Sequence, residues 1–165
     1  SNIYNVDPLD VPLFAPPGKA PKLKKGWGFI SLSHCQNGVL IGWSPYPIGV
    51  DIEISKRMIN GNNLKERILS VKEKENFKNI DIKKVNEHIL SKWVAKEAAI
   101  KWQRGNLFKD LNQWESSPHS DFYFHQSISK KVYVKLISLR IWLIAIAYDN
   151  EKHPHDPIIC LDKVS

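Results

Sequence analysis

The chain has 165 residues, of which 42% are hydrophobic and 25% are charged. It is therefore long enough to bury a core, and its composition excludes disorder throughout. Lys and Arg number 24 against 17 Asp and Glu, a formal net charge of +7, which favours an acidic or polyanionic partner. Cys35 and Cys160 are too few for a disulfide framework, so we expect a reducing, cytoplasmic compartment. The most apolar run, residues 137–148, is too short to cross a bilayer, and we expect no membrane partner.

Residues 1–26 are expected to form an extended, proline-rich arm. Proline at this spacing excludes a helix and disfavours a central strand. The prolines of the arm are Pro8, Pro12, Pro16, Pro17 and Pro21.

Strands are predicted next. Asn37-Gly38 lies between the apolar runs 29–33 and 39–43, and this pattern indicates a hairpin. A third strand is expected over residues 48–54.

The middle of the chain is predicted to be helical. Short helices are expected over residues 62–69 and 72–79, and a long helix from about residue 84 to 104. Gly105 is the expected cap of the long helix. Ser70 and Glu73 have the spacing of a capping box, which gives Glu73 a structural alternative to any chemical role.

Residues 121–149 return to strands, because they are rich in aromatic and β-branched residues. The order of strands, helices and strands predicts an α+β fold with a largely antiparallel sheet on a long helix. We divide the chain into the arm (1–26), a domain (27–149) and a polar C-terminal tail (150–165).

Asp51 and Glu53 are the first candidate site residues. Alternate residues of a strand share a face, so both should lie opposite the apolar residues 50, 52 and 54. Gly49 would leave open space beside them. The alternative is an edge strand with a solvated acidic face.

Glu97 and Lys101 form the second candidate group. Trp93, Glu97 and Lys101 are spaced four residues apart and make one row on a helix. Trp93 belongs to the apolar stripe, so the two charged residues should lie at its edge, where a cleft could open. The alternative is a simple surface ion pair.

Taken together, Asp51, Glu53 and Glu97 offer three hard oxygen donors. Such a set suits Mg²⁺, which usually completes its coordination with water and substrate phosphate. Lys101 could then hold a phosphate oxygen, so a phosphate-transfer site is plausible.

These motifs resemble those of a known family. Ile-Gly-Val-Asp-Ile-Glu at 48–53, followed about forty residues later by Trp-Val-Ala-Lys-Glu-Ala-Ala-Ile-Lys at 93–101, resembles the signature of 4'-phosphopantetheinyl transferases. Upstream, residues 30–35, 18–21 and 7–13 resemble segments of the longer, Sfp-type branch of that superfamily.

The resemblance implies a reaction and its partners. The phosphopantetheine arm of coenzyme A would be moved, with Mg²⁺, onto a serine of an acidic acyl or peptidyl carrier protein. Adenosine 3',5'-bisphosphate would be released. Such carriers serve fatty-acid, polyketide or nonribosomal peptide synthesis.

The resemblance also implies roles for individual residues. The metal ligands would be Asp51, Glu53 and Glu97. The catalytic residues would be Glu97, Lys101 and Glu73. The residues that bind coenzyme A would be Lys19, Ser33, His34 and Lys101. His34 could instead be a hydrogen-bonded turn histidine, and Lys19 a solvated loop lysine.

Sfp-type enzymes are built from two similar halves with coenzyme A between them. The matching segments correspond to the second half and the connecting arm, so the resemblance implies a chain that lacks the first half. Two copies could then pair as a homodimer to rebuild a cleft.

Two other functions compete with this one. The first is a non-catalytic module of the same fold that binds carrier proteins. The second is a basic α+β domain that binds nucleic acid, which the charge permits. The sequence has no RNA- or DNA-binding signature, and that function leaves the three acids unexplained, so we expect no nucleic-acid partner.

Overall fold

A computed structural model gives the structure of the chain. It describes residues 4–78, 80–117, 120–149, 151 and 157–160. Most of the predicted polar tail therefore lies outside the described residues.

The structure is α+β, as predicted. The strands are β1 (Leu13–Phe14), β2 (Lys22–Leu23), β3 (Phe29–Cys35), β4 (Gly38–Ser44), β5 (Ile48–Ile54), β6 (Trp114–Ser116), β7 (Phe122–His125), β8 (Lys130–Leu139) and β9 (Trp142–Tyr148). The helices are α1 (Gly61–Ile68), α2 (Val71–Phe77), α3 (Val85–Gln103) and α4 (Leu107–Asp110), with 3₁₀ turns η1 (Pro8–Asp10) and η2 (Ile82–Lys84). Among the described residues, no helix combines the length and the apolar character that a bilayer crossing requires.

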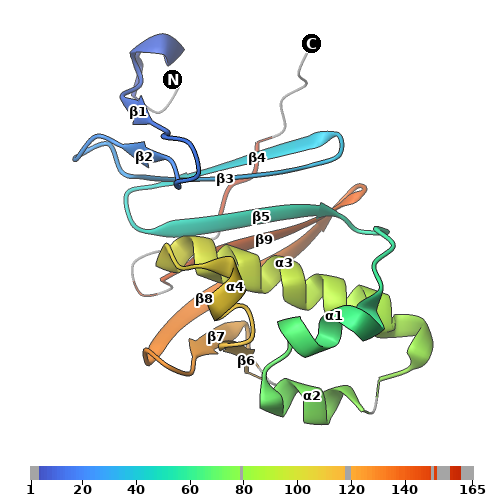
Figure 1. The fold of residues 1–165 in the computed structure, drawn as a ribbon. Coiled ribbons are helices and arrows are strands. Elements are labelled where there is room, and N and C mark those ends of the chain that lie inside the picture. The colour runs from blue at the N-terminus through green and yellow to red at the C-terminus, as the bar shows by residue number, and fades with distance from the viewer. Residues whose placement is uncertain (1–3, 79, 118–119, 150, 152–156, 161–165) are drawn as a thin grey trace.

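The main sheet is antiparallel and has five strands in the order β5-β9-β8-β7-β6. Figure 1 shows α3 lying along one face of this sheet, with α1 and α2 beyond it. The predicted hairpin is confirmed: β3 and β4 pair antiparallel around a turn in which Asn37 has a φ of 62°.

The arm is more structured than the sequence predicted. Its strands β1 and β2 pair antiparallel, with Leu13 opposite Leu23 and Phe14 opposite Lys22. This small hairpin lies next to β3 (Figure 1). Prolines do not prevent it because each strand is only two residues long and neither is central to a sheet.

Helix α3 is buried on most of its surface rather than along one apolar stripe. Nine of its residues are buried, including Lys96. The cause is its position between the main sheet and α1, so little of its circumference meets water. Small residues of β9, Ala145 and Ala147, are buried in the same core and allow the helix close to the sheet.

The outer edge of β5 is covered by β3, although the two strands form no ladder. The backbone N–H of Val50 donates to Ser31 Oγ at 3.0 Å, and that of Ile52 donates to Ser33 Oγ at 3.4 Å. Serine hydroxyls thus replace the missing backbone partners. The solvated acidic edge is therefore the wrong alternative, and Asp51 is only 3% exposed.

Gly49 does not leave open space, which corrects another expectation. A Cβ at Gly49 would lie 2.0 Å from the carbonyl oxygen of Ala98 and 2.4 Å from the nitrogen of Trp102. The backbones of β5 and α3 therefore touch, and this contact brings the acidic face of β5 against the helix.

The end of α3 also differs from the prediction by one residue. Arg104, and not Gly105, adopts the left-handed conformation that caps the helix, with a φ of 58°.

We expect Gly49→Ala to destabilise the fold strongly. The added methyl group meets backbone atoms of α3, which cannot move aside, so the free energy of unfolding should fall by more than about 3 kcal/mol. Urea unfolding followed by far-UV circular dichroism measures this change. Gly61→Ala is the control, because its Cβ would meet only side-chain atoms at 3.0 Å or more, and its effect should stay under about 1 kcal/mol. Equal stability of the two variants would contradict the close contact.

Candidate active site

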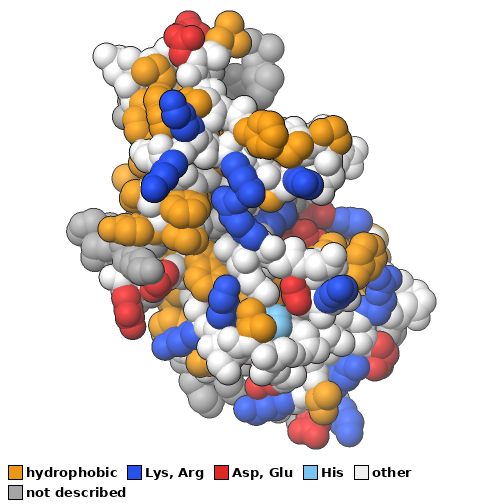
Figure 2. Space-filling view, turned by 60° about the vertical axis from the view of Figure 1, so that its left-hand side comes forward, with side chains coloured by type: hydrophobic (Ala, Val, Ile, Leu, Met, Phe, Trp, Pro, Cys, Tyr) orange, Lys and Arg blue, Asp and Glu red, His pale blue; other side chains and the backbone are white. Residues whose placement is uncertain are grey.

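A pocket of about 660 Å³ opens between the arm, β3, the end of α3 and the start of α4. Its charged lining residues are Lys19, Lys22, Glu97, Lys101 and Arg104. Figure 2, which brings this side of the molecule forward, shows Lys and Arg side chains gathered among hydrophobic ones. Four cations against one carboxylate, with apolar walls, suit an anionic ligand that also has an apolar part.

The structure brings Asp51, Glu97 and Lys101 together. Lys101 Nζ lies 2.7 Å from Asp51 Oδ1 and 3.8 Å from Glu97 Oε2. Ser33 Oγ donates a hydrogen bond of 2.6 Å to the same Asp51 oxygen. Asp51 is thus fixed by a lysine from α3 and a serine from β3, which positions it between these two elements.

Glu97 has a perturbed acidity. Burial raises its pKa, the charges of Asp51 and Glu53 raise it further, and Lys101 lowers it, leaving a pKa of about 7. A carboxyl group with this pKa can exchange a proton near neutral pH. Burial is the largest cause of the shift, and the nearby carboxylates add to it.

Glu53 lies on the acidic face but is engaged elsewhere, because it forms an ion pair with Arg57. In the part of the chain that the structure describes, no three His, Cys, Asp or Glu side chains are already grouped to hold a metal ion. The donor chemistry nevertheless fits a divalent cation. Asp51 and Glu97 are oxygen donors whose mutual repulsion a cation would relieve.

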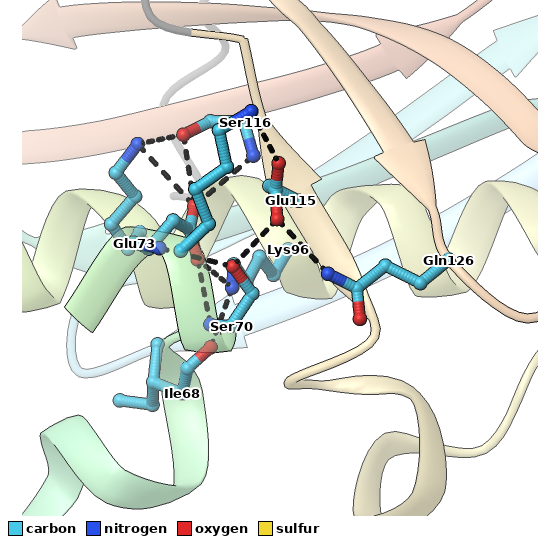
Figure 3. Close-up of polar contacts among 9 residues, drawn as sticks. Ile68, Ser70, Glu73, Lys96, Glu115, Ser116 and Gln126 are labelled. Carbon is cyan, nitrogen blue, oxygen red and sulfur yellow. Dashed lines mark hydrogen bonds and ion pairs between the residues drawn. The ribbon is translucent and has the colours of Figure 1, made fainter. Parts of the chain in front are cut away.

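Glu73 is not brought to this cluster, which corrects its predicted place. It is buried in a separate network with Lys96, Ser70 and Ser116 (Figure 3). Ser70 and Glu73 form the predicted capping box at the start of α2. Ser116 donates to Glu73 Oε1 from its backbone N–H at 3.1 Å and from its hydroxyl at 2.8 Å. With its oxygens occupied in this way, Glu73 acts as a structural acceptor.

Lys96 is the charge that balances Glu73, and the sequence did not single it out. Its ammonium group is fully buried and donates to Glu73 Oε2 and to the carbonyl oxygen of Ile68, both at 2.5 Å. Burial lowers the pKa of Lys96 to about 8 although Glu73 opposes this. Burial acts to raise the pKa of Glu73, but Lys96, the Ser70 backbone N–H and Lys92 together outweigh it, and the net pKa is lowered. The pair is therefore ionised at neutral pH.

The predicted coenzyme A ligands fall in three different places. Lys19 and Lys101 line the pocket. Ser33 is buried and holds Asp51. His34 is exposed on β3, on the face opposite Ser33, and it is not one of the residues that line the pocket. The alternation of a strand separates His34 from Ser33, whereas Ile30 and Leu32, on the same face as His34, do line the pocket.

Sequence reasoning missed two cations of the pocket, Lys22 and Arg104. Lys22 follows Lys19 in the arm, where the run of basic residues is the signal that could have found it. Arg104 directly precedes Gly105, the predicted helix cap.

The buried pair of Glu73 and Lys96 gives a stability prediction. Glu73→Gln leaves a buried ammonium group without its counter-charge, so we expect a loss of about 3–5 kcal/mol in the free energy of unfolding. Glu73→Gln combined with Lys96→Met removes both charges and should recover most of that loss. Urea unfolding measures both, with Glu75→Gln, exposed on the same helix, as the control. If Glu73→Gln unfolds at the same urea concentration as this control, the ion pair does not stabilise the fold.

Glu97 gives a prediction about pH. Its pKa is about 7 in the folded chain against an ordinary value of 4.5, so between these values the folded state binds more protons than the unfolded state. Stability contributed by Glu97 is therefore present below pH 4.5 and is lost as the pH rises towards 7.

Glu97→Gln should remove this part of the pH dependence and make the chain more stable than the wild type at pH 8. Urea midpoints from pH 4.5 to 8, measured in EDTA, test it, with exposed Glu87→Gln as the control. Parallel profiles for wild type and Glu97→Gln would contradict the raised pKa.

Comparison with known proteins places this arrangement in a family. A family model described as the 4'-phosphopantetheinyl transferase superfamily matches residues 47–148, which include β5, α3 and the whole acidic cluster. Among solved structures, the holo-ACP-synthase from Plasmodium yoelii is similar, with 17% sequence identity and a TM-score of 0.46, over 61% of this chain and 91% of that one. A search of curated proteins gave no significant match. The family match covers more than half of the residues, and the chain belongs to the 4'-phosphopantetheinyl transferase superfamily.

Proposed function

We propose that this chain is a holo-carrier-protein synthase, which transfers 4'-phosphopantetheine from coenzyme A to a serine of a carrier protein. The observation that carries the proposal is the cluster of Asp51, Glu97 and Lys101 at the pocket. Lys101 lies within 4 Å of both carboxylates, and Glu97 has a pKa of about 7. Together with membership of the superfamily, this cluster supports phosphoryl transfer.

Glu97 is the proposed general base. The serine hydroxyl of the carrier attacks the β-phosphorus of coenzyme A, and its proton passes to the Glu97 carboxylate. A new serine O–P bond forms while the bond from phosphorus to the bridging pyrophosphate oxygen breaks. Adenosine 3',5'-bisphosphate leaves with that oxygen. A bound Mg²⁺ would lower the pKa of Glu97 and so keep its carboxylate ionised and able to accept the proton at physiological pH.

Mg²⁺ is the proposed cofactor, held by Asp51 and Glu97, with Glu53 as a third ligand once it separates from Arg57. When bound, this ion would neutralise charge on the pyrophosphate. Ser33 then has a positioning role, because it fixes the orientation of Asp51. Lys101 can turn from Asp51 towards a phosphate oxygen, since its side chain is 30% exposed at the pocket.

The pocket is the proposed site of coenzyme A. Lys19 and Lys101 would hold its phosphates, as the sequence predicted, and Lys22 adds a further cation. The apolar walls, which include Pro21 and Ile100, would contact the adenine ring. His34 stays a prediction that the pocket does not support.

The carrier protein is proposed to dock on the basic surface of α1, α2 and the start of α3. An acidic partner would be drawn to this surface by long-range attraction. The basic residues are Lys65, Arg67, Lys72, Lys74, Lys78, Lys83 and Lys84.

Transfer of a fluorescent coenzyme A conjugate to an apo carrier protein tests the proposal. We expect labelling by the wild type in Mg²⁺, none in EDTA, and a loss of at least about 100-fold in Asp51→Ala and Glu97→Ala. Glu151→Ala, an exposed residue that follows β9 and lies outside the proposed docking surface, is the control and should label normally. Circular dichroism confirms that each variant is folded.

The outcomes separate the competing functions. Carrier binding without labelling by the wild type would favour the non-catalytic module. Tight binding to nucleic acid with a steep salt dependence would favour the basic domain that binds nucleic acid. Labelling that survives in Glu97→Ala would overturn the role of Glu97 as base.

A further inference from the structure

Arg104 has a backbone conformation that is unfavourable for arginine. It ends α3 with φ 58° and ψ 37°, and its N–H bonds to the carbonyl oxygens of Ile100 and Lys101. Glycine is the usual residue at such a left-handed helix end, because a Cβ crowds the backbone there. A residue with a side chain in this conformation is uncommon, and such positions concentrate at functional sites.

The neighbouring glycine is held by a different constraint. Gly105 is not in the left-handed conformation, and a Cβ on it would lie 2.2 Å from Asp110 Oδ2. Asp110 in turn accepts from the N–H of Asn106 at 2.7 Å. A side chain at Gly105 would displace Asp110 from this hydrogen bond, whereas nothing in the backbone of Arg104 requires a side chain. The arginine side chain therefore needs another explanation.

Arg104 borders the pocket and contacts an aromatic ring of β3. It is one of the pocket's lining residues, and its guanidinium lies 5.9 Å from the ring centre of Phe29 at the start of β3. This contact between cation and aromatic ring holds the guanidinium against the β3 side of the pocket.

Arg104 lies at the end of the pocket away from the carboxylates. Glu97, Lys101 and Arg104 are spaced i, i+4 and i+7, which places them in one row on α3. At 1.5 Å per residue, the row spans roughly 10 Å. On β3, Phe29 is four residues from Ser33, which holds Asp51, a distance of roughly 13 Å. Both elements therefore place the guanidinium well away from the reacting centre.

We propose that Arg104 is a specificity-determining residue that binds the 3'-phosphate of coenzyme A, and so selects coenzyme A over its dephospho form. This inference rests on the proposed function. The reacting pyrophosphate belongs with the carboxylates at the Glu97 end of the row, which leaves the remote phosphomonoester for the Arg104 end. A guanidinium binds a phosphate through two parallel hydrogen bonds, which a lysine cannot do.

Isothermal titration calorimetry with coenzyme A and with dephospho-coenzyme A tests the proposal. Arg104→Gln should weaken coenzyme A binding by at least about tenfold and leave dephospho-coenzyme A binding unchanged. Arg104→Lys should recover part of the loss. The matched control is Lys109→Gln, an exposed lysine of α4 outside the pocket lining, which should bind both ligands as the wild type does.

Arg104→Gly separates binding from folding. Glycine relieves the left-handed backbone, so its Tm should rise by about 2–4 °C while its affinity for coenzyme A falls as in Arg104→Gln. A Tm that stays the same or falls would contradict the conformational strain that we infer at Arg104.

Two further results would overturn the proposal. If Arg104→Gln weakens the binding of both ligands equally, or leaves both affinities unchanged, Arg104 does not recognise the 3'-phosphate. The proposed function would still stand. If the wild type binds neither ligand, the coenzyme A site itself is wrong and the role of Arg104 fails with it.

Discussion

The contact between Gly49 of β5 and the backbone of α3 is the constraint on which the site depends. A Cβ there would lie 2.0 Å from a helix carbonyl oxygen, so the strand and the helix meet without side chains between them. Asp51, two residues along the same face, is consequently buried beside α3. Its carboxylate and that of Glu97 share a poorly hydrated space, where their repulsion is strong. Lys101 balances Asp51 directly, while burial, together with the charge of Asp51, raises the pKa of Glu97.

Two clusters of charged residues lie against α3, and only one of them is accessible to a ligand. The network of Glu73 and Lys96 is closed, because each buried charge has its counter-charge and both Glu73 oxygens accept hydrogen bonds within the fold (Figure 3). A network of this kind stabilises packing and offers no group to a ligand. The group of Asp51, Glu97 and Lys101 is open, because Glu97 and Lys101 line a pocket and the pKa of Glu97 lies near neutral pH. This contrast is why we assign structure to Glu73 and chemistry to Glu97.

Local patterns predicted much of the fold and the centre of the site. Asn37-Gly38 indicated the hairpin, the Ser70 and Glu73 spacing indicated the capping box, and strand and helix periodicity indicated which acids share a face. What the sequence could not place were contacts between distant segments. Nothing in the spacing of Ser31 and Ser33 shows that their hydroxyls cover the edge of β5, or that the arm closes over the pocket. The sequence did not show the contacts of Glu73 for the same reason, since its partners Lys96 and Ser116 lie 23 and 43 residues away.

The residue that caps α3 has two conflicting requirements, to end the helix and to contact a ligand. A stable helix end would have glycine in the left-handed position, but glycine offers no group to a ligand. Here the glycine is displaced by one residue to Gly105, where the approach of Asp110 requires it, and Arg104 occupies the strained position. The result extends the row of Glu97 and Lys101 by a third charged side chain along the same pocket. A carboxylate at one end of the row and a guanidinium at the other would fix the direction in which a ligand with two separated phosphate groups lies, because only one orientation places the reacting phosphate beside Glu97.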